Sequence, residues 1–218
     1  MIRMIVNFKK KVKMKNLTLI FVAIACISCK AQTIVPLFGP KDYGTNNEYY
    51  KDTLNDLDKF IGIWEWSQGG DIWTIEIRKE LQVTNSQPLF QTTFFEDLLI
   101  GEYRYLENGT EIVNTLNLFN DPNINGRQHS IRGNQILNKH MIPKCDTCPE
   151  QERRTRLYFK DPTRDYLPLQ IILRYEVMPG GQERLQVYLL GRDTYIEPFP
   201  NAPNEPNPPM GEYILTKQ

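Results

Sequence analysis

The chain has 218 residues, of which 26 are basic and 26 acidic, so its formal net charge is zero. Removal of residues 1–28 as a leader takes away six basic and no acidic residues, which leaves 20 basic against 26 acidic and a net charge of −6. We expect no nucleic-acid partner, because phosphate binding needs a basic face. The remaining length of about 190 residues suits one domain with a sizeable core.

The first segment combines a basic stretch with a short apolar run. Residues 9–16 read KKKVKMKN, and residues 17–28 read LTLIFVAIACIS. A membrane-spanning helix needs about 20 apolar residues, so this run is too short to span. The pattern predicts a secretory signal peptide over residues 1–28. Translation from Met1 or from Met14 both fit this interpretation.

The end of this segment resembles a bacterial lipobox, in which a small residue precedes a cysteine that receives a lipid. Cys29, after Ser28, is the favoured site and Cys26 the alternative; ordinary cleavage or an uncleaved segment stays open. The letters SCKAQ resemble the lipoprotein junction of Bacteroidota. The resemblance implies a lipid on the cysteine that holds the protein at a membrane. Because Lys30 follows instead of an aspartate, it also implies the outer membrane, with the body in the periplasm.

The next residues predict a tether and one helix. Residues 29–46 are mixed, contain proline and glycine, and show no period, so we expect a lipid-attached tether. Within residues 47–59, Tyr50, Leu54 and Leu57 follow each other at spacings of four and three. This spacing predicts one short amphipathic helix.

From residue 60 onward the pattern is strand after strand. In DIWTIEIR, apolar and polar residues alternate as in a half-buried strand. About ten such runs follow one another up to residue 218. We therefore expect residues 47–218 to form a single all-β domain, an antiparallel β-barrel or sandwich of about 8–10 strands.

The tripeptide Gly62-Ile63-Trp64 resembles the opening strand of lipocalins and related calycin barrels. That resemblance implies that the glycine permits close backbone approach and that the tryptophan closes one end of the barrel. An arginine packs on this tryptophan in lipocalins, and Arg174 or Arg184 are the candidates here. The wider pattern also resembles uncharacterised flavobacterial lipoproteins, which carries no activity. The aromatic residues expected to face a ligand in such a barrel are Trp66, Trp73, Tyr103 and Tyr105.

Three connections can be predicted in detail. Asn108-Gly109 suits a two-residue hairpin turn, which would place Tyr105 opposite Ile112. The stretch VMPGGQER needs an odd-numbered turn of three or five residues to keep the apolar faces together. Residues 196–210 contain many prolines and predict a stiff surface loop, or a docking arm.

Cys145 and Cys148 lie in the stretch HMIPKCDTCPE. In an exported protein the first expectation is a disulfide that closes a tight loop. A metal site is the weaker alternative, because His140 gives a third ligand whereas zinc prefers four. A redox role would need a helix N-terminus, which this stretch does not predict.

Evidence for catalysis in the sequence is thin. The chain has two histidines, no Gly-x-Ser-x-Gly elbow and no phosphate-cradling loop. Glu96-Asp97 reads as a turn, and in RRTR the residues Arg154 and Arg156 read as a solvated strand face or a contact for lipid phosphates. We expect no cofactor and no enzyme.

Two main functions remain. The first is a structural or accessory envelope lipoprotein that acts through surface contacts with a protein or glycan. The alternative is a lipocalin-like module that binds a small apolar or amphipathic ligand. A pocket that joins His129 or His140 to a carboxylate would favour an enzyme.

Overall fold

The computed structural model describes residues 32–40, 42–192 and 199–218. The predicted signal peptide and both candidate lipidation sites, Cys26 and Cys29, lie outside these residues, as does the start of the predicted tether. Residues 34–218 form one compact unit. Within the described part of the chain, no helix has the length and apolar character needed to cross a membrane.

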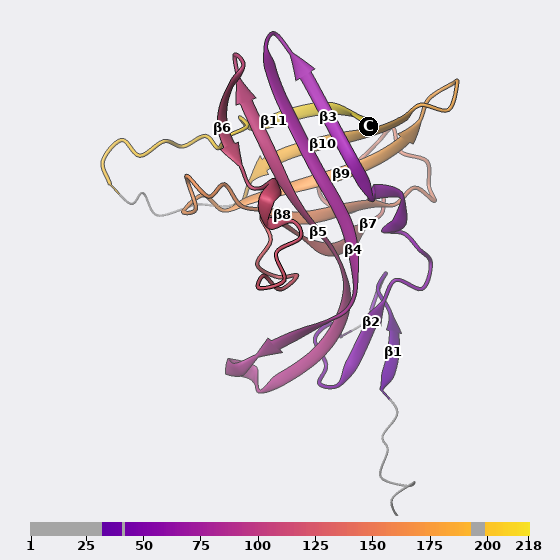
Figure 1. Ribbon diagram of the computed structural model, residues 1–218. Coiled ribbons are helices and arrows are strands. Elements are labelled where there is room, and N and C mark those ends of the chain that lie inside the picture. Colours follow the sequence, from indigo (N-terminus) through magenta and orange to yellow (C-terminus); the bar gives the residue numbers. More distant parts are fainter. Residues whose placement is uncertain (1–31, 41, 193–198) are drawn as a thin grey trace, which may run out of the picture. The chain divides into compact units, whose positions relative to one another are not determined.

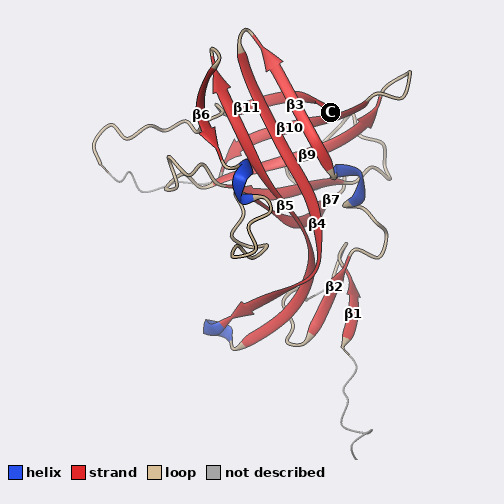
Figure 2. Cartoon of the chain, in the orientation of Figure 1, coloured by secondary structure: helices blue, strands red, loops and turns tan. Residues whose placement is uncertain are grey.

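The described residues form a closed barrel of eight antiparallel strands, which confirms the predicted all-β class and selects a barrel over a sandwich (Figures 1 and 2). Each strand pairs with the next along the chain, and β11 with β3 and β5 with β7 complete the ring. The architecture is consistent with a lipocalin-like barrel. The strands are β3 (Gly62–Gln68), β4 (Asp71–Gln87), β5 (Thr92–Glu107), β7 (Ile131–Leu137), β8 (Arg154–Phe159), β9 (Leu169–Val177), β10 (Glu183–Gly191) and β11 (Gly211–Lys217).

Three further strands attach to this ring. The free edge of β5 pairs with β2 (Glu48–Lys51), then with β7, then with β6 (Thr110–Asn114), at successive positions along its length. Strand β1 (Thr33–Pro36) borders β2. Because β4 and β5 are 17 and 16 residues long, they continue past the barrel and form a projecting arm beside β1 and β2 (Figure 1). Short 3-10 helices, η2 (Pro88–Phe90) and η3 (Leu116–Leu118), lie in connections.

Large aromatic side chains fill the barrel interior. Trp73 makes edge-on contacts with Phe159 and Tyr213, at ring-centre distances of 6.0 and 4.8 Å. Tyr103 packs on Phe159 at 4.8 Å. Such tilted and edge-on pairs are the favoured geometry for aromatic rings. The inward-facing positions of an eight-stranded barrel are just sufficient to fill it, and here bulky rings occupy them.

The prediction of a helix over residues 47–59 is wrong. Strand β2 occupies its first part, turns follow, and a single 3-10 helix, η1 (Asp58–Phe60), ends the segment. The Asp52 carboxylate accepts hydrogen bonds from the backbone N–H groups of Asp56 and Leu57, at 2.8 and 3.0 Å. Aspartate side chains compete with helical hydrogen bonds in this way. Leu54, one of the expected helix-face residues, is exposed.

Of the two predicted hairpins, only the first differs from the expected register. The Asn108-Gly109 turn is present, but a bulge between the Leu106–Glu111 and Tyr105–Val113 pairs leaves Ile112 unpaired and places Val113 opposite Tyr105. Val113 is therefore the buried residue and Ile112 is exposed. The second hairpin has the odd-numbered loop expected, with five residues between Val177 and Glu183. The described part of the proline-rich segment, residues 199–210, is a loop before β11.

Candidate functional site: an arginine-lined groove on the outer wall

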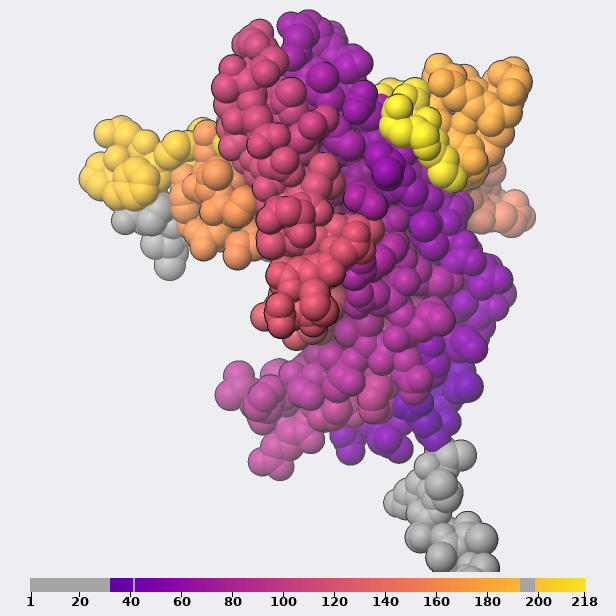
Figure 3. Space-filling view, in the orientation of Figure 1, coloured from indigo at the N-terminus to yellow at the C-terminus, as the bar shows by residue number. Residues whose placement is uncertain are grey.

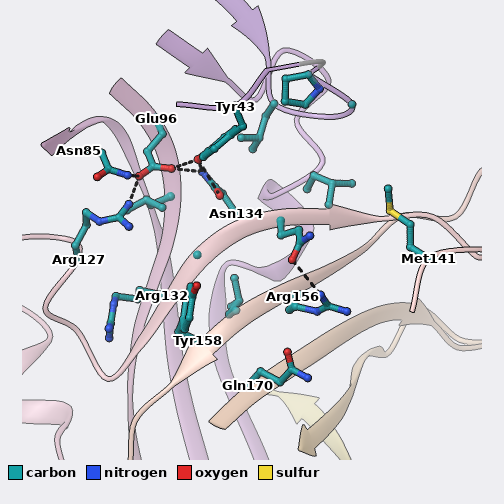
Figure 4. A pocket seen from close by; sticks show the side chains of 18 of the residues that line it. Tyr43, Asn85, Glu96, Arg127, Arg132, Asn134, Met141, Arg156, Tyr158 and Gln170 are labelled. Carbon is teal, nitrogen blue, oxygen red and sulfur yellow. Dashed lines mark hydrogen bonds and ion pairs between the residues drawn. The ribbon is translucent and has the colours of Figure 1, made fainter. Parts of the chain in front are cut away.

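A groove of about 550 Å³ lies on the outer wall of the barrel beside β7 (Figure 4). The groove forms because β5 and β7 pair over only three residue pairs, and the pairing ends at Leu99 and Gly133. Beyond this point β7 bulges against β8, and β5 continues into the projecting arm. The groove is lined by the outer faces of β7 and β8, by the segment around Tyr43, and by β5 near Glu96.

Glu96 organises one end of the groove. Its carboxylate is buried and accepts hydrogen bonds from the side-chain amides of Asn85 and Asn134, at 3.0 and 2.8 Å. It also accepts a hydrogen bond from the Tyr43 hydroxyl group and forms an ion pair with Arg127. Burial, followed by the Glu96 charge, raises the pKa of Tyr43 above its usual value, so Tyr43 remains a donor. Four partners therefore fully occupy this carboxylate.

The prediction that Glu96-Asp97 forms a turn is wrong, because both residues lie inside β5. Neighbouring side chains on a strand point to opposite faces, and the two carboxylates indeed have separate partners. Asp97 accepts the Tyr49 hydroxyl at 2.5 Å and the Asp52 backbone N–H at 2.9 Å. Both carboxylates thus join the projecting arm to the segments packed against it.

The other end of the groove is cationic. The guanidinium groups of Arg192 and Arg132 lie 4.9 and 5.7 Å from the ring centre of Tyr158. Arg156 donates to the Gln135 side-chain oxygen at 3.3 Å (Figure 4). Burial, followed by the charge of Arg127, lowers the pKa of Arg132. Among the ion pairs of the described residues, no carboxylate partners Arg132, Arg156 or Arg192.

The predicted disulfide between Cys145 and Cys148 is confirmed. The prediction that Arg154 lies on a solvated strand face is wrong, because this residue is only 3% exposed. Its guanidinium donates to the backbone oxygens of Asn138 and Pro143, at 3.0 and 2.8 Å. Arg154 therefore fastens the disulfide-bearing loop onto the outer wall. Sequence alone does not show that this loop covers the strand.

The alternative metal site at the same loop loses its ligands. Both sulfur atoms, of Cys145 and Cys148, form the disulfide, and His140 Nε2 lies 2.9 Å from Glu150 Oε1 at the surface. The described stretches of the chain contain no group of three or more metal-binding side chains.

The aromatic residues expected to face a ligand lie in the barrel and not in the groove. Trp73, Tyr103 and Tyr105 are fully buried in the core, and Trp66 packs edge-on against Tyr213 at 4.9 Å. None of them lines the groove. The structure thus places these rings in contact with one another and with neighbouring core residues.

Gly62 and Trp64 lie at the start of β3. The Trp64 ring is buried, and its Nε1 donates to the Phe60 carbonyl at 2.9 Å. Gly62 has a φ of +141°, a conformation that favours glycine. The cation over Trp64 is Lys217, at 5.4 Å, and not one of the arginines expected from the lipocalin resemblance. Arg174 pairs instead with Glu152.

Both histidines contact carboxylates, but neither lines the groove. His129 belongs to the connection between β6 and β7, which Figure 3 shows at the surface beside the long strands β4 and β5. Its Nδ1 is 2.9 Å from Glu102 Oε1, and both side chains are buried. His140 contacts the exposed Glu150. Neither pair meets the expectation of an open catalytic pocket.

The groove itself was missed by the sequence analysis. Its arginines come from β7, β8, the residue after β10 and the connection before β7. Arg156 was noticed in RRTR, but no spacing along the chain unites it with Arg127, Arg132 and Arg192. Their proximity depends on strand register.

The profile of a family described as "Family of unknown function (DUF6705)" matches residues 14–218. No curated protein and no solved structure matches the chain.

Proposed function

Because this chain belongs to the family of unknown function DUF6705, we propose its function from its own features. It is a lipid-anchored accessory protein of the cell envelope that binds a partner or ligand through its outer surface and performs no catalysis. Its body is a closed barrel, and the groove beside β7 is its contact site.

The observation that carries this proposal is the position of the groove. The interior positions hold the buried rings of residues such as Trp64, Trp73 and Tyr103. The groove is lined by outward-facing side chains such as Arg132, Arg156 and Tyr158. Concave sites with a few convergent polar groups are the usual places for ligands. A surface role therefore fits better than an interior one.

The N-terminal sequence supports the envelope location. The basic stretch, the apolar run and Cys29 fit a lipoprotein signal, and the Cys145–Cys148 disulfide fits an oxidising compartment. We assign the protein to the outer membrane, with the barrel in the periplasm.

Metabolic labelling with an alkyne-tagged palmitate tests the anchor. We expect label on the wild-type chain and on Cys26→Ser, and none on Cys29→Ser. Globomycin, which blocks the lipoprotein signal peptidase, should cause the uncleaved precursor to accumulate. An unlabelled wild-type chain in the soluble fraction would overturn the proposal that the protein carries a lipid anchor.

A lipocalin-like role in binding a small apolar ligand is the second candidate. One observation favours it: Trp73 Nε1 and Tyr103 Oη are buried, with no hydrogen-bond partner in the described structure. Buried polar atoms normally have partners, and a ligand inside the barrel would supply them. Native mass spectrometry of the gently purified protein should reveal such a ligand, and a bare mass after mild extraction counts against this role.

A further inference from the structure

We propose that the groove beside β7 binds a phosphorylated sugar, with the arginines on the phosphate and the side-chain amides on the sugar hydroxyls. The inference rests on the proposed function, because it names the ligand of the same surface site. Neither histidine, neither cysteine of the disulfide, and no metal takes part.

The charge of the groove is the first argument. Four arginines and one carboxylate line it, although the whole chain is balanced at 26 basic and 26 acidic residues. The carboxylate, Glu96, is already held by Arg127 and three neutral partners. The positive charge of Arg132, Arg156 and Arg192 is therefore uncompensated within the groove. Like charges that line one groove repel one another, and a bound anion relieves the repulsion.

The donor geometry is the second argument. Each guanidinium carries five N–H donors in a planar fork that matches phosphate oxygens. Arg132 donates to the His129 carbonyl at 2.9 Å, and Arg156 to the Gln135 side chain and the Ile142 carbonyl. These bonds orient the two side chains and leave further N–H groups for a ligand. Three cationic forks suit a phosphate monoester, which carries up to two charges, better than a single carboxylate.

The groove also supplies neutral polar groups. Asn85 and Asn134 contact Glu96 at one end, Gln135 accepts a hydrogen bond from Arg156 and Gln170 lies nearer the arginines (Figure 4), and Gln87 also lines the groove. Amides both donate and accept hydrogen bonds, as sugar hydroxyls require. The side-chain N–H groups of Asn85 and Asn134 already bond to Glu96, so the sugar would use the glutamine amides. The volume of about 550 Å³ falls within the range of small-ligand sites. The ligand is thus a sugar ring or pair of rings that carries a phosphate.

The source of such a group is either a soluble sugar phosphate or the phosphorylated headgroup of a glycolipid. Isothermal titration calorimetry of the purified full-length chain in detergent compares three probes: glucose 6-phosphate, glucose and inorganic phosphate. The comparison separates recognition of the phosphate charge from recognition of the sugar. Flotation with phosphatidylcholine vesicles, with and without lipid A, tests the membrane source. We expect glucose 6-phosphate to bind more tightly than inorganic phosphate, and glucose to bind least.

Arg156→Gln and Arg192→Gln should each weaken binding about 10- to 100-fold, the effect of losing one charge-assisted hydrogen bond. Arg184→Gln is the matched control, because Arg184 lies on β10 and does not line the groove. Thermal melting of each variant checks the fold. Arg192 lies beyond the end of β10, so its side chain can be changed without altering the barrel core.

The inference is overturned if none of the phosphate probes, including lipid A vesicles, binds the wild-type chain. It is equally overturned if the Arg184 variant loses as much affinity as the groove variants, because binding would then be non-specific attraction. Equal binding of inorganic phosphate and glucose 6-phosphate would refute the sugar part. Labelling at Cys29 is unaffected by all these outcomes, so failure of the groove and failure of the anchor are separately visible.

Discussion

His129 Nδ1 lies 2.9 Å from Glu102 Oε1, and the two side chains are 0% and 1% exposed. The backbone N–H of Ser130 donates to the same carboxylate oxygen at 3.2 Å. The other polar atom of each side chain, Glu102 Oε2 and His129 Nε2, has no hydrogen-bond partner in the described structure. This contact joins the long connection before β7 to the outer face of β5, at the strand pair from which the groove opens.

We predict that His129→Ala lowers the free energy of unfolding by about 2–4 kcal/mol, because it leaves Glu102 buried without its main partner. Urea denaturation followed by tryptophan fluorescence measures the change. His140→Ala is the control: its side chain is exposed, and surface pairs contribute about 0–1 kcal/mol. Equal effects of the two substitutions would contradict the structural importance of the buried pair.

Trp73→Ala should lower the free energy of unfolding by about 3–5 kcal/mol, because it creates a cavity in a packed interior. Trp73 is completely buried between Phe159 and Tyr213. The shift in urea midpoint is compared with that of Phe90→Ala, whose ring is 74% exposed. A midpoint that does not move in the Trp73 variant would show that the barrel interior is not filled as described.

Gly62→Ala should destabilise the barrel by about 1–3 kcal/mol through backbone strain. The φ of +141° is unfavourable for alanine, and the added Cβ would lie 2.9 Å from Lys217 Cε, which must move. Thermal melting measures the loss. Gly191→Ala, at a strand end where the new Cβ meets Met210 Sδ at 3.4 Å, should change the melting temperature much less, and a reversed order would refute this explanation.

The Cys145–Cys148 disulfide closes a very short loop and therefore restricts the unfolded chain only a little. Its removal should lower the free energy of unfolding by only about 2 kcal/mol. The double variant Cys145→Ser/Cys148→Ser tests this in urea. The wild-type chain with a reducing agent should unfold at the same midpoint as the variant. A much larger loss in the variant would mean that the loop held by Arg154 contributes to the core stability of the barrel.

Stability should fall as the pH rises through 10 toward 12. Burial, followed by the charges of Asp71 and Glu107, raises the pKa of Tyr105 from 10.0 to about 12, and burial also raises that of Tyr213 to about 12. Below pH 10 both hydroxyls are protonated in folded and unfolded chains, so their contribution is fully present. Between the two values the unfolded chain loses protons first, which favours unfolding.

Tyrosinate absorbance and circular dichroism, recorded together during alkaline titration, check this prediction. The tyrosinate signal of the buried residues should appear together with loss of structure. Tyr105→Phe removes one titrating group, so its stability should fall less steeply over the same range. Complete tyrosine ionisation with the circular dichroism spectrum unchanged would contradict the burial of these hydroxyls.

Much of the fold could be predicted because strand signals are local. The alternation of Trp73, Ile75 and Ile77 with polar residues identified β4. The disulfide followed from the close spacing of two cysteines. The helix prediction failed at Asp52, because one carboxylate bound two backbone N–H groups that a helix would have used.

The strands and the short disulfide loop could be read from the amino-acid order, and so could the predicted lipid anchor at Cys29, since each depends on residues close together along the chain. The closure of the barrel, its filling by its own aromatic rings, and the meeting of Arg132, Arg156 and Arg192 on its outer wall became visible only in the folded chain. These features depend on strand register, because residues far apart in sequence become neighbours only through the hydrogen-bonded pairing of strands. That pairing depends on the bulge at Gly133 as much as on any local pattern.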